Sequence, residues 1–392
     1  MTTESATASQ ETKPGGGLHV PELDGLRGIA VLIVMLYHFT AVKKYGTSIL
    51  DEVVYGLSKT GWLGVDLFFV LSGFLITGIL LRARGTSKSY FKSFYVRRVL
   101  RIFPLYYAYL FLFFVLLPIF ADQVFPAKQL AQLESLLDIQ AWFWLYASNI
   151  YTFLQGDHTG LATSHFWSLA IEEQFYLVWP LVVFAFSGAT LRKLCVGLIG
   201  IAFGIRVALY MLGYDPVSIY VFSPARMDTL LSGALLAIWV HQGVDTESLL
   251  RLARRVLMVL SPIAIGILWF GGQHPTNHPA IFTIGYSIFA FCFTSIIAIA
   301  VLDDSPGRYR NLLTTRPLRF LGKYSYGLYV IHVLVFALGS RAFGDPVVIF
   351  GTQLIWQLGF TLACLSVTVI GALVSWHVME KRFLQLKDRF EY

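Results

Sequence analysis

One arginine and one histidine in the first apolar stretch of the chain have types and a spacing that suit chemistry. Arg27 precedes His38 by eleven residues. In a helix this is about three turns, so both side chains lie on one face, ~16 Å apart along the axis. An imidazole titrates near neutral pH and can serve as an acid, a base or a nucleophile. A guanidinium binds anionic groups through its planar fork.

Further ionisable residues interrupt the apolar stretches that follow. A charged side chain at the centre of a bilayer costs about 2.5–3.5 kcal/mol and usually faces a cavity or a partner. In the topology derived below, six such residues fall in the outer half of the membrane. They are His38, Asp66, Glu173, Arg206, Arg226 and Asp228, and Tyr176 and His332 lie in the same set of stretches. We interpret this coincidence as a polar cavity in the outer half, reached from the inside past Arg27.

Each of these residues also has a structural interpretation. An intramembrane histidine such as His38 or His332 can simply hydrogen-bond a neighbouring helix. Arg226 and Asp228 can pair with each other or with Arg206 and hold helices together. Asp66 can serve only to orient a backbone group or an arginine.

The elements that must position these residues are membrane-spanning helices. Of the 392 residues, 56% are hydrophobic and 14% are charged, and the mean hydropathy is +0.65. Because a soluble domain carries charge on roughly a quarter of its residues, this composition excludes a soluble protein. A span needs about 20 mostly apolar residues. Ten stretches qualify, at 25–42, 62–81, 102–120, 166–187, 194–212, 220–241, 256–271, 279–302, 324–340 and 347–379. The last exceeds one bilayer thickness, so it must tilt or project.

The distribution of basic residues decides the status of a shorter apolar stretch at 141–155. If this stretch does not cross and the N-terminus is cytoplasmic, 22 of the 30 Lys and Arg residues fall in inside segments and 5 in outside segments. If it crossed, the bias would collapse. The positive-inside rule therefore predicts an all-α integral membrane protein with about ten transmembrane helices, one short re-entrant or interfacial segment and both termini cytoplasmic.

The composition of the chain ends and loops completes the predicted organisation. Residues 1–24 are polar and are expected to form a disordered cytoplasmic tail. They are followed by a transmembrane domain at 25–385 and a cytoplasmic tail at 386–392. No cleavable signal peptide is visible, so the first span is expected to be retained. Three widely spaced cysteines suit neither a metal site nor a disulfide framework, and no metal is expected. The net charge of +7 resides in loops between apolar stretches, which favours topology and anionic ligands over nucleic acid.

Six motifs carry a resemblance to a known family. They are LDGLRGIAVLIVMLYHF at 23–39, GVDLFFVLSGFLI at 64–76, FYVRRVLRIFPLYY at 94–107, FWSLAIEEQFYLVWPL at 166–181, RMDTLLSGALLA at 226–237 and LGKYSYGLYVIHV at 321–333. In this order they are similar to acyltransferase family 3, whose members O-acylate surface polysaccharides, peptidoglycan, lipids and some natural products. The resemblance runs from about residue 21 to 383.

The resemblance implies a fold of about ten helices in the plasma membrane and a cytoplasmic acyl-CoA donor. The family's basic residue followed eleven positions later by histidine matches Arg27 and His38. Its two arginines separated by two residues match Arg98 and Arg101, and its glutamate before Phe-Tyr matches Glu173. Some relatives carry a C-terminal SGNH-type esterase domain. This sequence shows none, so it is expected to be similar to the stand-alone members.

The matched residues suggest roles in acyl transfer from CoA, which is a polyanion at one end and a thioester at the other. His38 is the expected base or acyl carrier, with Glu173 or Asp66 holding its second ring nitrogen. The residues expected to bind acyl-CoA are Arg27, Arg97, Arg98 and Arg101, although the last three can instead serve only to set the topology. Those expected in the acceptor site or as oxyanion stabilisers are Arg206, Arg226, Asp228, Tyr176 and His332.

The sequence therefore predicts an enzyme that transfers an acyl group, acetyl in the first instance, from acyl-CoA to a hydroxyl. Acyl-CoA is a co-substrate, and no permanently bound cofactor is expected. The acceptor is a glycan, a glycolipid or a natural product such as a macrolide, handled in contact with membrane lipid. Direct transfer and an acyl-histidine intermediate both remain open. The alternative from another class is a transporter or flippase of a polar small molecule or lipid-linked sugar, because intramembrane charges also mark transport paths. A third hypothesis is a channel that hands the acyl donor to a separate enzyme.

Overall fold

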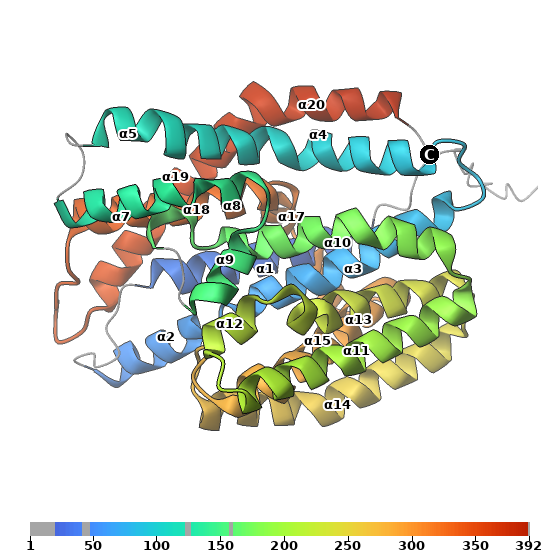
Figure 1. Cartoon of the computed structure of the whole chain (residues 1–392). Helices are drawn as coiled ribbons and strands as arrows, with labels where there is room; N and C mark the ends of the chain where they lie inside the picture. Colours follow the sequence, from blue (N-terminus) through green and yellow to red (C-terminus); the bar gives the residue numbers. More distant parts are fainter. Residues whose placement is uncertain (1–19, 41–47, 122–126, 157–159, 391–392) are drawn as a thin grey trace, which may run out of the picture.

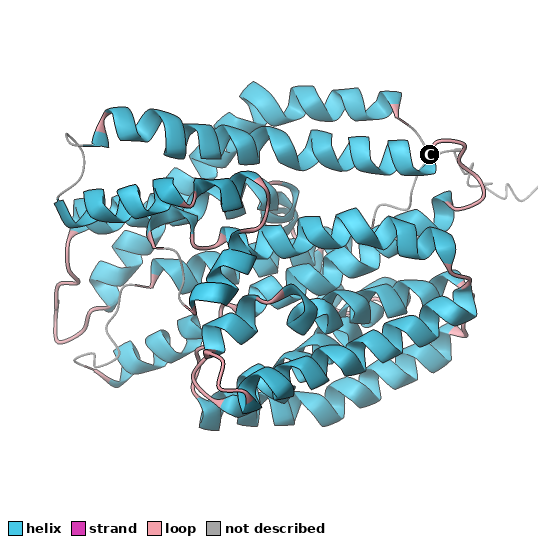
Figure 2. Ribbon diagram, in the orientation of Figure 1, coloured by secondary structure: helices cyan, strands magenta, loops and turns pink. Residues whose placement is uncertain are grey.

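The computed structural model describes residues 20–40, 48–121, 127–156 and 160–390. Within these ranges the chain consists of helices joined by loops, without a β-strand (Figure 2). The prediction of an all-α membrane protein is confirmed for this part of the chain. Residues 1–19, most of the predicted N-terminal tail, lie outside the described residues.

Nine helical segments in the described ranges are long and apolar enough to span a membrane, whereas ten were predicted. They are Ile49–Ala83 (α2 and α3), Tyr90–Ile119 (α4, η1 and α5), Phe166–Ala185 (α10), Gly188–Met211 (α11), Pro216–His241 (α12 and α13), Thr246–Gly271 (α14), Ile281–Leu302 (η3 and α15), Ser325–Phe343 (α18) and Leu354–Leu386 (α19, η4 and α20). The tenth predicted span corresponds to α1 (Pro21–Phe39). This helix begins four residues earlier than predicted. Because it contains three charged residues, Glu22, Asp24 and Arg27, its apolar part is too short to count among the nine candidate spans.

Side chains next to two helix starts cap the backbone N–H groups of the first turn. Ser48 and Asp51 form a capping box at the start of α2 (Ile49–Lys59), each side chain accepting the backbone N–H of the other. The carboxylate of Asp245 accepts the N–H of Ser248 and caps α14. The last segment, Leu354–Leu386, is longer than one bilayer span, as predicted.

The apolar stretch at 141–155 does not span a membrane. It forms α8 (Gln140–Trp144) and α9 (Ser148–Gln155). Eight residues of helix measure about 12 Å, well short of the ~30 Å hydrocarbon core. Together with α7 (Ala127–Asp138), which was not predicted, these short helices lie toward one end of the bundle, where α2 is also found (Figure 1).

Loops predicted on the same side of the membrane lie at the same end of the bundle. At one end, Arg310 pairs with Glu22 at 2.7 Å. At the other, the indole N–H of Trp62 donates to the carbonyl of Gln273 at 2.8 Å. Which end faces the cytoplasm stays a prediction.

Glycine allows two core helices to meet backbone to backbone. A Cβ at Gly73 of α3 (Leu63–Ala83) would lie 1.8 Å from the carbonyl oxygen of Leu230 in α13 (Ser223–His241). No side chain fits there, so the two helices pack at the closest distance that backbones permit. This contact forms the centre of the bundle against which α10 and α15 (Tyr286–Leu302) pack.

Candidate functional site

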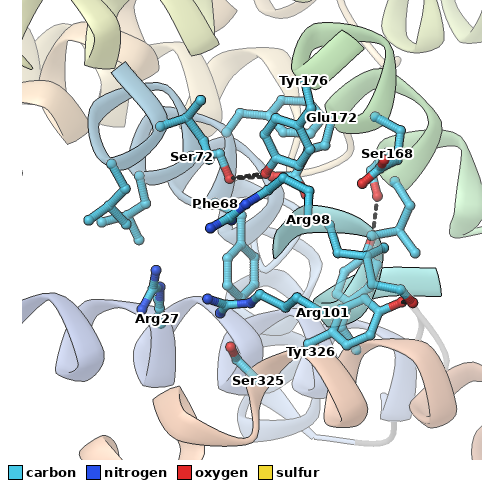
Figure 3. A pocket seen from close by; sticks show the side chains of 18 of the residues that line it. Arg27, Phe68, Ser72, Arg98, Arg101, Ser168, Glu172, Tyr176, Ser325 and Tyr326 are labelled. Atoms are coloured by element: carbon cyan, nitrogen blue, oxygen red, sulfur yellow. Dashed lines mark hydrogen bonds between the residues drawn. The ribbon is translucent and has the colours of Figure 1, made fainter. Parts of the chain in front are cut away.

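An inner cavity of about 110 Å³ lies where α1, α3, α4 (Tyr90–Phe111), α10 and α18 meet (Figure 3). Five of the six sequence motifs contribute to these helices. The polar residues that line the cavity are Arg27, Ser72, Arg98, Arg101, Ser168, Glu172, Glu173, Tyr176, Ser325, Tyr326 and Tyr329. The fold thus brings together residues that lie far apart in the sequence.

Three arginines dominate one side of this cavity. Arg98 and Arg101 are three residues apart, so α4 presents both from one face, and their guanidinium groups point toward Arg27 of α1 (Figure 3). Arg27 Nη1 lies 3.3 Å from the carboxylate oxygen Oδ1 of Asp24 and forms an ion pair with it. No described residue accepts a hydrogen bond from Arg98 or Arg101, and the Nε of Arg98 is buried without a partner. Buried polar groups in native proteins are normally satisfied, so the unpartnered Nε of Arg98, beside Arg101 and Arg27, favours an anionic ligand.

Arg97, the third arginine of the predicted cluster, does not line the cavity. Its Nη1 donates to the carbonyl oxygens of Lys387 and Phe390 at 3.3 and 3.1 Å. Because successive helical residues point about 100° apart, Arg97 turns away from the face that carries its neighbour. It holds the C-terminal segment against α4.

The acidic residues predicted from the fourth span lie in the same cavity as the arginines. Glu172 accepts a hydrogen bond from Ser72 Oγ at 2.5 Å, and the hydroxyl of Tyr176 donates to Ser72 Oγ at 3.1 Å. Glu173 also lines the cavity. The structure therefore places Glu173 and Tyr176 beside the arginine group.

Ser168 and Tyr329 also line the cavity. Their hydroxyl oxygens are 2.5 Å apart, joining α10 to α18. Behind this pair, the ring centroid of Tyr329 lies 5.5 Å from His165 and 5.4 Å from His332. One lining residue of the cavity, Tyr329, thus contacts two imidazole rings.

Three histidines from different elements form a cluster. The ring centroid of His332 in α18 lies 4.8 Å from that of His38 in α1 and 5.2 Å from that of His165. His332 Nδ1 lies 2.6 Å from the carbonyl oxygen of Tyr329, and His332 Nε2 lies 3.2 Å from His38 Nδ1. His38 Nδ1 is also 3.0 Å from the carbonyl oxygen of Val34.

These contacts assign the protons in the neutral pair. A carbonyl oxygen can only accept, so Nδ1 of His332 and Nδ1 of His38 both carry hydrogen. His332 Nε2 then accepts from His38 Nδ1, and the lone pair of His38 is on Nε2. The arrangement selects the tautomer of His38 in which Nε2 is the basic atom.

His165 is the member of the cluster that the sequence analysis missed. It is 3% exposed, and its Nε2 donates to the carbonyl of Val330 at 3.2 Å. Its Nδ1 has no hydrogen-bond partner within the described residues. His165 lies one residue before the span of α10, and burial lowers the pKa of its imidazole to about 3, so the ring is neutral. The available signal was its position directly before the motif at 166–181.

The other predicted charges form buried ion pairs away from the cavity lining. Arg226 of α13 pairs with Asp66 of α3, and both are fully buried. Arg206 of α11 pairs with Asp228 at 2.8 Å, and Ser287 donates to the same carboxylate at 2.6 Å. These contacts correspond to the structural interpretation, in which the charges join helices.

A second, wider pocket of about 630 Å³ opens beside the inner cavity. Arg27, Arg101 and Tyr326 line both. The two spaces therefore adjoin at these three side chains. The wider pocket lies at the end of the bundle that carries the residues predicted to be cytoplasmic, among them Arg316 and Lys387.

The comparison with known families fits this geometry. A family model described as an acyltransferase domain matches residues 20–376. The chain belongs to this acyltransferase family. The motifs that carried the resemblance supply Arg27, His38, Arg98 and Arg101, and His332 as well, so the family's characteristic residues converge on the cavity and the histidine cluster.

Curated relatives match along most of this chain. YrhL of Bacillus subtilis is 31% identical over 370 residues, covering 93% of this chain and 54% of that protein. The peptidoglycan O-acetyltransferase OatA of Listeria monocytogenes is 30% identical over 330 residues, with 82% and 50% covered. The O-acetyltransferase OatA of Staphylococcus aureus is 32% identical over 337 residues, with 81% and 51% covered. The chain spans about half the length of these relatives. No solved structure matches it significantly.

Proposed function

We propose that this protein is a membrane O-acyltransferase that moves an acetyl group from cytoplasmic acetyl-CoA to a hydroxyl of a glycan acceptor at the opposite face of the plasma membrane. The observation that carries the proposal is the adjoining pair of pockets, which share Arg27 and Arg101, with Tyr329 of the inner cavity in contact with the histidine cluster. Relatives whose names include peptidoglycan O-acetyltransferase support acetyl as the acyl group and a sugar hydroxyl as the acceptor. Family membership favours this enzyme over the transporter alternative.

The shapes of the two pockets support a donor that enters head outward. CoA joins a phosphate-rich head to a narrow, uncharged arm that ends in the thioester. The volume of the wider pocket, about 630 Å³, falls in the usual 300–1,000 Å³ range of small-molecule sites, and the volume of the inner cavity, about 110 Å³, is much smaller. The guanidinium groups of Arg98, whose Nε is buried without a partner among the described residues, and of Arg101 then supply charge-assisted hydrogen bonds to donor phosphates.

His38 is the proposed base, acting through Nε2. The acceptor hydroxyl gives its proton to this nitrogen while its oxygen attacks the thioester carbonyl carbon. The new C–O bond forms, the C–S bond breaks, and the departing thiolate takes the proton from the imidazolium. In the alternative route, Nε2 attacks the thioester carbon first, the C–S bond breaks and CoA leaves as the thiolate. The acceptor oxygen then displaces the imidazole from the acyl group, and the hydroxyl proton passes to the imidazole and from it to the thiolate. In both, the acyl group passes the Ser168–Tyr329 pair, because His38 does not line the inner cavity.

Thiol release from acetyl-CoA by the purified protein in lipid nanodiscs tests this proposal. The wild type is expected to release CoA slowly alone and faster with a glycan acceptor. His38→Ala is expected to abolish release while keeping acetyl-CoA affinity and thermal stability close to wild type. His377→Ala, an exposed histidine in η4 (Trp376–Glu380), is the matched control and is expected to keep full activity. Release that does not depend on His38 would refute the assigned role, and a transporter would move its cargo without cleaving the thioester.

The acceptor requires a separate measurement. Mass spectrometry of the host's envelope and secreted metabolites, with and without this gene, is expected to show an acyl mass difference on a cell-wall glycan. A difference confined to a secreted natural product would contradict the glycan assignment and leave the transfer chemistry in place.

A further inference from the structure

The wider pocket carries a set of cations that the acyl transfer itself does not use. Arg316, Arg319 and Lys323 are spaced three and four residues apart in α17 (Arg316–Lys323), so one face of the helix presents all three. All three line the pocket. Among described residues, neither Arg316 nor Arg319 has an ion-pair partner or a hydrogen-bond acceptor for its side chain. If these residues served only to set the topology, they would need to lie on one side of the membrane. They would not need to lie together on one helix face that lines a pocket.

An aromatic row lies next to these cations. Ring centroids are 4.9 Å apart between Phe320 and Tyr324, and 5.3 Å apart between Tyr324 and Trp376. Lys323 Nζ lies 5.1 Å from the Tyr324 centroid and 5.5 Å from that of Trp376. Phe320 is 38% exposed, although it is a large apolar side chain. Aromatic faces beside cations are the means by which proteins hold a nucleobase and its phosphates together.

The charge of the pocket lining is strongly positive. Its cations are Arg27, Arg101, Arg316, Arg319, Lys323 and Lys387, and its carboxylates are Asp24 and Glu380. Both carboxylates have partners within the protein. Asp24 lies 3.3 Å from Arg27, and Glu380 accepts from Ser375 Oγ at 2.7 Å. The pocket is therefore suited to a ligand with several negative charges.

Backbone contact with α1 fixes the position of α17. A Cβ at Gly322 would lie 1.9 Å from the carbonyl oxygen of Asp24, and one at Gly28 would lie 2.1 Å from that of Leu318. Neither position accepts a side chain, so α17 cannot move along α1 without breaking this contact. The cationic face of α17 is thus held at a set distance from Arg27.

We propose that this pocket binds the phosphorylated nucleoside end of the acyl donor, with the α17 cations on its phosphates and the aromatic row against its base. This inference rests on the proposed function and adds a second recognition site to it. The protein then recognises the donor at two places, α17 for the nucleoside end and Arg98 with Arg101 nearer the thioester. An anionic lipid headgroup shares the phosphate chemistry. The aromatic row and the junction with the inner cavity favour the nucleoside.

A donor series separates the two recognition sites. Acetyl-CoA and acetyl-4′-phosphopantetheine carry the same thioester arm, and only the first has the nucleoside. In nanodiscs of neutral lipid, calorimetric titration is expected to show that the wild type prefers acetyl-CoA. In Arg316→Ala/Arg319→Ala this preference is expected to fall at least about tenfold, as for a lost charge-assisted hydrogen bond, with little change for acetyl-4′-phosphopantetheine. Arg308→Ala removes an exposed charge from α16 (Arg308–Leu313), outside the pocket lining, and is the matched control.

A second variant tests the aromatic row without changing charge. Phe320→Ala is expected to weaken acetyl-CoA about fivefold or more, the usual loss for a base that stacks on an aromatic ring, and again to spare acetyl-4′-phosphopantetheine. A folded double arginine variant that keeps the full wild-type preference overturns the inference and leaves the transfer proposal standing.

Two further outcomes are decisive. If no acyl donor is turned over, the transfer proposal fails, and titration with adenosine 3′,5′-bisphosphate still tests the pocket. Binding that is lost in Arg316→Ala/Arg319→Ala supports the inference, and absence of binding to the wild type overturns it. If the double variant alters only the response to phosphatidylglycerol nanodiscs and not the donor preference, the pocket binds lipid headgroups and the nucleoside assignment is wrong.

Discussion

His332 Nε2 lies 3.2 Å from His38 Nδ1, a contact that joins α18 to the C-terminal turn of α1. The carbonyl oxygens of Tyr329 and Val34 assign the ring protons on either side of it. His332 is thereby the hydrogen-bond acceptor that holds one tautomer of His38, in the way that a second residue commonly orients a catalytic imidazole. In the proposed mechanism His332 is therefore a positioning residue, whereas the sequence alone suggested a place in the acceptor site.

Substitution of His332 should affect turnover and spare donor binding. His332→Leu removes the side-chain acceptor of His38 Nδ1 and leaves only the backbone carbonyl oxygen of Val34. It is expected to lower kcat on the order of 100-fold, the scale of lost acid–base catalysis. His332→Gln offers an amide oxygen in place of Nε2 and should retain more of the activity. The measurements are kcat, acetyl-CoA affinity and thermal unfolding of each variant. A folded His332→Leu protein with wild-type kcat would contradict the role.

The three arginines of α4 should separate into two groups. Arg98→Ala or Arg101→Ala is expected to weaken acetyl-CoA binding by about 1.5–3 kcal/mol, as for a lost charge-assisted hydrogen bond. Lysine should restore only part, because it lacks the planar fork. Arg97→Ala is the control with the same charge change, since Arg97 contacts the carbonyls of Lys387 and Phe390. Equal losses of affinity in all three variants, measured by calorimetry, would refute the division.

The buried pair Arg226–Asp66 should matter for stability and not for donor binding. Asp66→Ala leaves a buried guanidinium uncompensated and is expected to cost about 3–5 kcal/mol of unfolding free energy. Asp66→Leu combined with Arg226→Met should recover most of that loss, because apolar replacements of buried ion pairs are often neutral. Unfolding in mixed micelles, together with acetyl-CoA titration, measures both effects. A stable Asp66→Ala protein without turnover would instead assign Asp66 to the chemistry.

The orientation in the membrane can be tested with two cysteine substitutions. Lys88 is exposed in the loop between α3 and α4, and a Cβ at Gly56 in α2 meets no atom closer than 3.9 Å. On whole cells, an impermeant maleimide is expected to label Gly56→Cys, and Lys88→Cys only after lysis. The native cysteines are all buried, so their background should be low. Labelling of Lys88→Cys on intact cells would reverse the topology.

The sequence was informative where the relevant property is local. Stretch length predicted the nine candidate spans of the described residues, and helical periodicity placed Arg27 and His38 on one helix, which is α1. The same local reasoning grouped Arg97 with Arg98, although neighbours on a helix point in different directions. The start of α1 was predicted four residues late, and the short amphipathic helix α2 was not predicted, because neither segment is a simple apolar stretch.

Contacts between distant residues could not be read from the sequence. His38 and His332 are 294 residues apart, and the position of α18 against α1 results from packing of the whole bundle. Arg226 and Asp228 are two residues apart, yet each pairs with a different helix. His165 went unnoticed because one histidine at the edge of an apolar stretch has no recognisable spacing partner.

The ion pairs of α13 also order the biosynthesis of the protein. Asp66 enters the membrane with α3, 160 residues before Arg226 is made, and Arg206 enters with α11 ahead of Asp228. Until α13 is inserted, Asp66 and Arg206 lack their final partners. A charge at the centre of a bilayer costs about 2.5–3.5 kcal/mol. One helix then neutralises both at once. A chain that stops before α13 therefore has two charges in its membrane helices without the partners that they have in the complete bundle.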